Sequence, residues 1–195
     1  MQTTAIIRTI GRNTLGNSII SCIKEKMDVI VLFDGVPIFT PVKSVHVQYV
    51  QLGRKWGHYG HIGINVGAAL SKTEFITVVD DDDELIVGAG DIIRNCLKTK
   101  PEIDIWIPTL KFNNSLQLCF KEKGVTPGNI AVPTYRCSIF YRVPFSLELI
   151  AGKDENYFDF FHVEKCVSLG YSVDWINSPI YNVRPKLTGT NGRGV

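Results

Sequence analysis

Three short, largely apolar segments constrain the fold of this chain more than any other feature. They cover residues 4–9, 28–33 and 75–79, and unbroken apolar runs of this length are typical of parallel strands that are covered on both faces. Between the first two, apolar side chains recur every four residues from Leu15, which predicts a helix to about residue 26. Strand, helix and strand in this order predict a βαβ unit and an open, mostly parallel α/β sheet flanked by helices.

The rest of the chain predicts a continuation of this alternation, with less regularity in the second half. The expected helices cover residues 61–71, 89–98 and 156–169. The expected strands cover residues 45–52, 103–108, 116–120, 138–142 and 173–181. Residues 123–133 are expected to form a loop and the glycine-rich residues 186–195 a flexible tail. A length of 195 residues with 45% hydrophobic residues fits a single domain with a sizeable core.

The net charge of the chain is too small to indicate a nucleic acid or membrane partner by electrostatics alone. The 21 lysine and arginine residues nearly balance the 19 aspartate and glutamate residues, so neither nucleic acid nor a membrane surface is an expected partner. The five cysteines are scattered, with no pair spaced for zinc, and are expected to be reduced thiols. No secretion signal and no stretch of about 18 apolar residues is visible, so a cytoplasmic protein without a membrane span is expected.

Four consecutive aspartates, residues 80–83, directly follow the apolar run at residues 75–79. Like charges this close disfavour full ionisation unless a cation offsets them. Carboxylate oxygens suit Mg²⁺ or Mn²⁺, which normally bridge such groups to substrate phosphates. Ligands of such sheets bind beyond the carboxyl ends of the strands, where Asp34 also falls. A solvated acidic turn is the alternative, and the position directly after a buried strand favours a metal site.

Residues 65–83 carry a more specific pattern: an asparagine, a glycine, a helix of small residues, a short acidic turn, a strand and Asp-x-Asp-Asp. This pattern resembles the core signature of family-two GT-A glycosyltransferases, and residues 4–9 and 31–35 resemble the first two strands of that family. The resemblance implies one GT-A domain over residues 1–195, with a nucleotide-sugar-binding half at about 1–85 and an acceptor-side half at about 86–185. A chain of this size could also be the catalytic domain of a larger protein.

The resemblance implies a set of donor-binding residues. Asp80 and Asp82 match the two acids of the DxD motif, with Asp82 on the metal and Asp80 either nearer the ribose or sharing the ion. The expected donor-binding residues are Thr9, Asp34, Arg54, Lys55, Asn65, Asp80, Asp81 and Arg184. Two alternatives stay open, because Asp34 could be a turn residue before a glycine and the cations at 54 and 55 could be surface charges.

A further match lies downstream, where Asp159 stands eleven residues before a Gly-Tyr pair at 170–171. By resemblance to the family, an aspartate at this helix start is the general base of inverting transfer, followed by a basic residue, here Lys165. The sequence departs from the family at Phe158, where a glutamate is usual. Asp154 or Glu155 could therefore be the base instead, and Asp159 could be only a helix cap or a partner of the helix dipole.

Two other positions depart from simple expectations. Many relatives place a histidine that completes the metal shell where this chain has Arg184, so either the metal has fewer protein ligands or Arg184 meets the diphosphate directly. His58 and His61 flank a Tyr-Gly pair. With no carboxylate or third ligand nearby in the sequence, a loop role is expected for both histidines rather than a metal site.

The expected activity is metal-dependent transfer of a sugar from a nucleoside-diphosphate donor to a hydroxyl of a glycan or glycoprotein acceptor, with inversion. A uridine diphosphate donor is the commonest case in the family. A nucleotidyltransferase is the first alternative, although its glycine-rich, arginine-containing loop is missing after the first strand. A phosphatase of the haloacid-dehalogenase type would need Thr or Val where Asp83 and Glu84 stand. A non-catalytic metal- or sugar-binding module is the last alternative, and EF-hand spacing fails because Leu85 occupies the sixth loop position.

Overall fold

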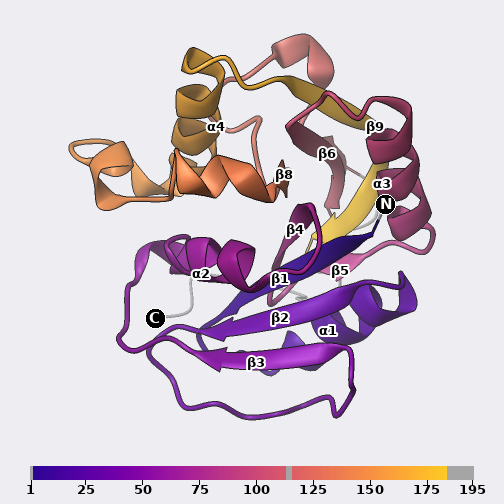
Figure 1. The fold of residues 1–195 in the computed structure, drawn as a ribbon, viewed down its shortest axis with the longest axis vertical. Helices are drawn as coiled ribbons and strands as arrows, with labels where there is room; N and C mark the ends of the chain where they lie inside the picture. Colours follow the sequence, from indigo (N-terminus) through magenta and orange to yellow (C-terminus); the bar gives the residue numbers. More distant parts are fainter. Residues whose placement is uncertain (1, 113–115, 184–195) are drawn as a thin grey trace.

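The computed structural model describes residues 2–112 and 116–183 (Figure 1). Its strands are β1 (Thr3–Thr9), β2 (Asp28–Phe33), β3 (Val47–Gln51), β4 (Phe75–Asp80), β5 (Glu84–Leu85), β6 (Ile105–Phe112), β7 (Leu116–Leu118), β8 (Thr134–Arg136) and β9 (Val173–Val183). The α-helices are α1 (Leu15–Lys24), α2 (Gly63–Leu70), α3 (Ala89–Thr99) and α4 (Phe158–Ser168). Short 3₁₀ helices are η1 (His58–Gly60), η2 (Lys121–Lys123), η3 (Cys137–Tyr141), η4 (Leu147–Ile150) and η5 (Glu155–Tyr157).

The strands form one sheet in the order β3-β2-β1-β4-β8-β6-β9-β5, with β7 paired to β6. The first four strands of this order are parallel to one another, and β6 is parallel to β9, while β8 joins the two groups by antiparallel pairing. The predicted mostly parallel α/β sheet flanked by helices is therefore confirmed. Because β1, β2 and β4 are parallel and adjacent, their carboxyl ends meet at one edge of the sheet.

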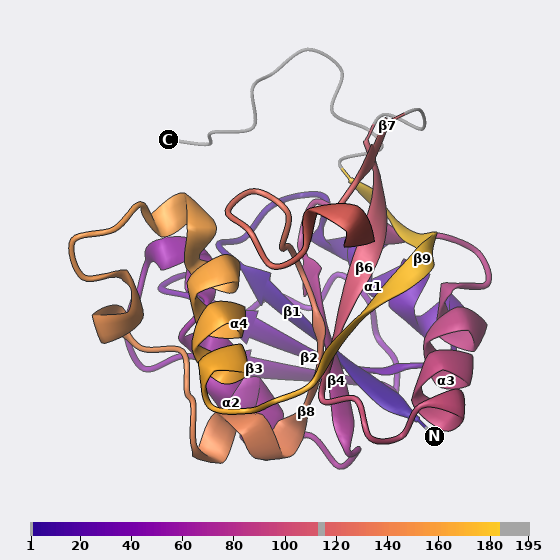
Figure 2. The same ribbon diagram turned by 90° about the horizontal axis from the view of Figure 1, so that it is seen from above.

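Helices cover both faces of the sheet. Figure 2 shows α2 and α4 on one side and α1 and α3 on the other. Helix α1 connects β1 to β2 and helix α2 connects β3 to β4, in opposite directions along the sheet, so right-handed crossovers put these two helices on opposite faces. Helix α2 lies very close to β1, because a Cβ atom added to Gly67 would stand 2.8 Å from a side-chain carbon of Ile6. The glycine of the sequence signature is thus explained by helix–sheet packing.

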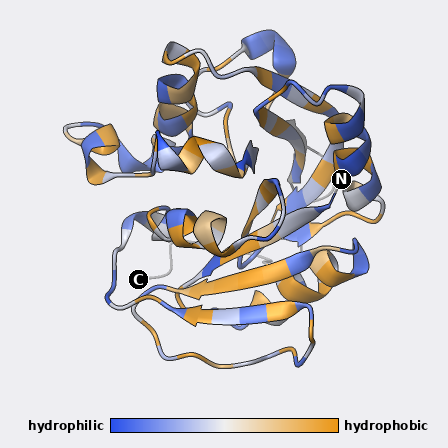
Figure 3. Ribbon diagram, viewed as in Figure 1, coloured by the Kyte–Doolittle hydropathy of each residue, from blue (hydrophilic) through white to orange (hydrophobic). Residues whose placement is uncertain are grey.

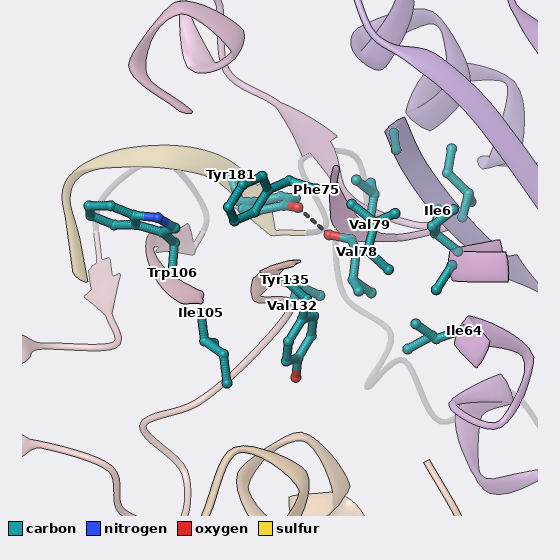
Figure 4. Close-up of a cluster of buried hydrophobic side chains, with 14 of the residues drawn as sticks. Ile6, Ile64, Phe75, Val78, Val79, Ile105, Trp106, Val132, Tyr135 and Tyr181 are labelled. Carbon is teal, nitrogen blue, oxygen red and sulfur yellow. Dashed lines mark hydrogen bonds between the residues drawn. The ribbon is translucent and has the colours of Figure 1, made fainter. Parts of the chain in front are cut away.

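The apolar runs of the sequence form the buried centre of this sheet. All seven residues of β1 and the first five of β4 are buried, and apolar residues extend along β2 (Figure 3). The hydroxyl of Tyr181 on β9 donates a hydrogen bond to the carbonyl oxygen of Val78 on β4 (Figure 4). All five cysteines are free thiols. No helix in the described part of the chain is long and apolar enough to cross a membrane.

The second half differs from expectation in several places. The strand expected at 138–142 is wrong: the segment forms the 3₁₀ helix η3, and the strand of this region is β8, just before it. A short apolar run does not distinguish the two structures, and the η3 geometry buries the neighbouring side chains of Ile139 and Phe140. Strands β6 and β9 are longer than expected because they pair with each other along their lengths. The expected tail at 186–195 lies outside the described residues.

Candidate active site

The acidic run lies at the carboxyl end of β4. Asp80 is the last residue of the strand, and its side chain is 39% exposed. Asp81, Asp82 and Asp83 follow in the turn to β5 and are buried. The carboxyl groups of Asp81, Asp82 and Asp83 are therefore withdrawn from water. Their negative charge can be retained there only if positive groups lie nearby.

Arg8 supplies the first compensation. It stands beside Asp80 in the parallel register of β1 and β4, and the two side chains form an ion pair. Burial lowers the pKa of Arg8, but the charges of Asp80 and Asp159 outweigh burial, so its pKa is raised overall. Arg8 therefore stays charged, and its charge acts on Asp80, Asp159 and Asp81. The atoms Nε and Nη1 of this buried side chain have no hydrogen-bond partner among the described residues.

Arg12, from the loop that leads into α1, supplies the second compensation. Its guanidinium forms an ion pair with Asp81 and lies 3.5 Å from Oδ1 of Asp82. The hydroxyl of Thr9 also donates a hydrogen bond to Asp81, at 2.6 Å. Burial raises the pKa of the Asp81 carboxyl and outweighs the opposing effects of Thr9 and Arg12. Thr9 thus lies beside the acidic run, where its hydroxyl contacts Asp81 and accepts from the N–H of Gly11. A contact of Thr9 with a donor stays a prediction.

The sequence analysis does not identify Arg8 or Arg12 as a partner of the acids, although the position of Arg8 indicates that it needs one. Arg8 interrupts an otherwise uncharged strand that is buried throughout, and a charged side chain in such a strand requires a partner. The two arginines also supply positive charge that the sequence analysis attributed to a metal ion alone. Within residues 2–112 and 116–183, no three His, Cys, Asp or Glu side chains are grouped so that they could hold an ion by themselves.

The donor set at Asp80 and Asp82 nevertheless fits a hard divalent cation. Both supply carboxylate oxygens at the sheet edge, and Mg²⁺ is usually held by one or two carboxylates together with water and phosphate oxygens. A site with two protein ligands therefore needs the phosphates of a ligand for completion. The assignment of Asp80 and Asp82 to a metal stays a prediction.

Asp34, directly after β2, binds the protein's own backbone. The N–H groups of Trp56 and Gly57 donate to its two carboxylate oxygens at 2.6 and 3.0 Å, and the residue is 1% exposed. These bonds fix the loop between β3 and α2. A direct contact of Asp34 with a nucleoside stays a prediction, and the geometry favours an effect through the loop.

The cations at 54 and 55 lie in this same loop. The guanidinium of Arg54 stacks over the ring of Trp56, 3.7 Å from its centroid. Lys55 packs so closely on Gly35 that a Cβ atom there would stand 2.4 Å from Cβ of the lysine. Both positions are thereby fixed near the end of β2, at the edge where ligands of such sheets bind.

Asn65 on α2 joins the two halves of the molecule. Its side-chain amide donates to the carbonyl oxygen of Phe145 and accepts from the N–H of the same residue, both at 2.9 Å. The donor and acceptor functions of the amide are thus used within the protein. Arg184, the last predicted donor-binding residue, lies outside the described residues.

Asp159 lies in the first turn of α4, and its side chain is only 14% exposed. Nε2 of His61 is 3.2 Å from Oδ1 of Asp159, while the N–H of Val132 donates to Oδ2 at 3.4 Å. Burial would raise the pKa of this carboxyl, but His61 and Arg8 outweigh it and lower the pKa to about 2. Asp159 is therefore ionised over the whole physiological range. Its described hydrogen bond goes to the backbone of residue 132 and not to its own helix.

The two alternative bases have different surroundings. Glu155 pairs with His58 at 2.6 Å, and its side chain is exposed while that of His58 is half-buried. Asp154 is the N-cap of η5, and its side chain accepts hydrogen bonds from the backbone and side chain of Asn156. The loop role expected for the histidines is thus incomplete. His58 contacts Glu155 in η5, and His61 contacts Asp159 in the first turn of α4. Local sequence patterns do not reveal these two contacts, because the partners are about a hundred residues apart in the sequence.

A cavity of about 360 Å³ lies elsewhere, between α3, the facing strands β6 and β9, and η2. Its lining includes Trp106, Lys121 and Asp174. None of the predicted site residues contributes to it. The candidate site lies at the edge of the sheet, where the carboxyl ends of β1, β2 and β4 and the start of α4 supply its residues.

No family model matches the chain, and no curated protein matches it significantly in sequence. Solved structures do match. S. aureus TarS 1–349 gives a TM-score of 0.70 at 16% identity, over 94% of this chain and 60% of that chain. Its complex with UDP-GlcNAc gives 0.65 at 15% identity, over 94% and 58%.

A mannosyltransferase from Pyrobaculum calidifontis, in complex with GDP-Man and Mn²⁺, gives a TM-score of 0.65 at 14% identity, over 91% of this chain and 55% of that chain. At such low identities the likeness shows the fold, which is a GT-A-like glycosyltransferase fold. The chain spans about 60% of the length of the TarS 1–349 structure.

Proposed function

We propose that the chain is a metal-dependent glycosyltransferase that moves a sugar from a nucleoside-diphosphate donor to an acceptor hydroxyl with inversion. The observation that carries this proposal is the position of Arg8, whose charge acts on both Asp80 and Asp159. The candidate donor-binding acids and the candidate base thus belong to one electrostatic unit, although they lie far apart in the sequence.

Each proposed role follows from the chemistry of the side chain. A divalent ion held by Asp80 and Asp82 would offset the charge on the diphosphate leaving group. The unpaired N–H groups of Arg8 suit an oxygen of the same ligand. Asp159 takes the proton of the acceptor hydroxyl while its oxygen forms the new bond to the anomeric carbon. The bond from that carbon to the diphosphate breaks, and the nucleoside diphosphate leaves with the electron pair.

The structural neighbours support the choice of donor class. Their structures contain UDP, UDP-GlcNAc or GDP-Man, and one contains Mn²⁺. For this chain we propose a uridine diphosphate hexose as donor, Mn²⁺ or Mg²⁺ as cofactor and a glycan or glycoprotein hydroxyl as acceptor. Arg54 and Lys55 would lie beside the nucleotide, at the end of β2.

A panel of nucleotide sugars tests this function directly. Thermal shift with and without Mn²⁺ identifies the donor, because a ligand that binds only the folded state raises Tm. Release of nucleoside diphosphate is then measured with water or glycan acceptors. Metal-dependent release is expected with the donor that stabilises the chain. Stabilisation by a donor with no release under any acceptor would indicate a binding module, and no stabilisation by any donor would contradict the proposal.

A further inference from the structure

The loop between β3 and α2 connects the donor edge of the site to the candidate base. At one end Asp34 fixes the N–H groups of Trp56 and Gly57. The loop then turns tightly through positive φ angles at Gly57, His58 and Gly60, of 68°, 49° and 71°. Positive φ is costly for a non-glycine residue, so His58 is held there by its surroundings. The turn delivers His61 to the start of α4.

His61 is buried between two aromatic rings, and each of its ring nitrogens faces an oxygen. Its ring centroid is 5.4 Å from that of Phe145 and 4.9 Å from that of Phe158. Nδ1 donates to the carbonyl oxygen of His58 at 2.8 Å, and Nε2 faces Oδ1 of Asp159 at 3.2 Å. Nδ1 is thus engaged within the loop, and Nε2 lies within ion-pair distance of the Asp159 carboxylate.

We propose that His61 is a positioning residue for Asp159, which rests on the proposed function of Asp159 as the base. His61 holds Oδ1, so the carboxylate cannot rotate freely. Oδ2 accepts a hydrogen bond from the N–H of Val132 at 3.4 Å. Both carboxylate oxygens are thereby placed by groups outside α4.

An effect of His61 on the ionisation of Asp159 would distinguish a positioning role from simple packing. Burial alone would raise the pKa of Asp159 and favour the neutral acid, which cannot take a proton. The nearby charge of His61 is the largest influence against burial, ahead of that of Arg8. Other titratable groups coupled to Asp159 are Cys119, Tyr135 and His162. Loss of His61 should therefore change the ionisation of the base as well as its orientation.

Two variants test the role of His61. His61→Phe keeps an aromatic ring among Phe145 and Phe158 but cannot donate, whereas His61→Gln retains one donor. We expect His61→Phe to lower kcat roughly tenfold to hundredfold, the range typical of residues that orient a reacting group, with little change in the KM for the donor. His61→Gln should recover part of the loss. The acid limb of the pH profile of kcat should move upward in His61→Phe.

A direct titration keeps the test independent of activity. The carboxyl carbon of Asp159 is followed by NMR with ¹³C-labelled aspartate, assigned with Asp159→Asn. In His61→Phe its midpoint should rise from about 2 to the ordinary value of an aspartate or above. His58→Asn, which removes the pair with Glu155 but tolerates the positive φ of residue 58, is the matched control and should leave both readouts unchanged.

The outcomes separate this inference from the proposed function. An unchanged midpoint and unchanged kcat in folded His61→Phe overturn the positioning role, and so does an equal loss in His58→Asn, which would indicate a general role of the loop. If no sugar transfer is found in the parent protein, the proposed function fails, while a raised midpoint still shows that His61 controls the Asp159 carboxylate.

Discussion

The acids at the two ends of the candidate site share the charge of Arg8 but differ in their second cation. At the donor end, Arg8 and Arg12 pair with the acids of the β4–β5 turn. At the base end, His61 pairs with Asp159. A guanidinium keeps its charge at every physiological pH, whereas an imidazole can lose it near neutrality. The donor end is therefore compensated permanently, whereas the base end depends in part on an imidazole, a group that can lose its charge.

The base end should show the largest effect of a single change. We expect Asp159→Asn to keep the fold and donor binding but to lower the rate of transfer on the order of a hundred- to ten-thousand-fold, because the amide cannot take a proton. Steady-state kinetics with the donor identified by thermal shift measure this. Glu155→Gln and Asp154→Asn are the controls and should retain activity. Loss of transfer in either control, with activity kept in Asp159→Asn, would move the base to that residue.

The donor end should respond in binding rather than in proton transfer. We expect Asp82→Asn to weaken binding of the nucleoside diphosphate in Mn²⁺ by about a hundredfold, which is about 2.7 kcal/mol, because a proposed metal ligand is lost while the fold remains. Calorimetric titration with and without chelator measures the effect. Chelator should weaken the parent and leave the variant nearly unchanged. Equal binding by the parent in Mn²⁺ and in chelator would remove the metal from the mechanism.

The pH dependence of stability tests the base end separately from catalysis. The folded-state pKa of Asp159 is lowered to about 2, so its pairing stabilises the protein above the unfolded pKa and is lost as pH falls from about 4 to about 2. The contribution is on the order of 2 kcal/mol. Urea titrations at pH 6 and pH 3 should show a smaller loss of stability for Asp159→Asn than for the parent. An equal loss in both proteins would show that the pair with His61 is not linked to folding.

The smallest effect is expected at the loop that joins the two ends. Asp34→Ala leaves two backbone N–H groups without their acceptor and should weaken donor binding roughly tenfold, about 1.4 kcal/mol, without unfolding the chain. Asp34→Asn, which keeps one acceptor oxygen, should lie between the parent and Asp34→Ala. A donor dissociation constant equal to that of the parent in both variants would leave Asp34 as a turn residue with no influence on the site.

Local sequence patterns predicted the elements that build the site but only part of their contacts. The strands around Asp34 and Asp80, and the helix that begins beside Asp159, follow from apolar runs and helical spacing. The donor-binding role of Asn65 was predicted from family resemblance. In the fold both functions of its amide are used by Phe145, eighty residues away in the sequence. Spacing along the chain carries no information about such a partner.

The sequence by itself determined a parallel α/β sheet, because an unbroken apolar run can be buried only with both faces covered, and it determined that four carboxylates end one of its strands. The tertiary structure decided which groups hold those charges. Arg8 reaches Asp80 because β1 and β4 are adjacent and parallel, and His61 reaches Asp159 because a tightly turned loop meets the start of α4. Charge compensation depends on distance in space, which folding fixes and local sequence does not.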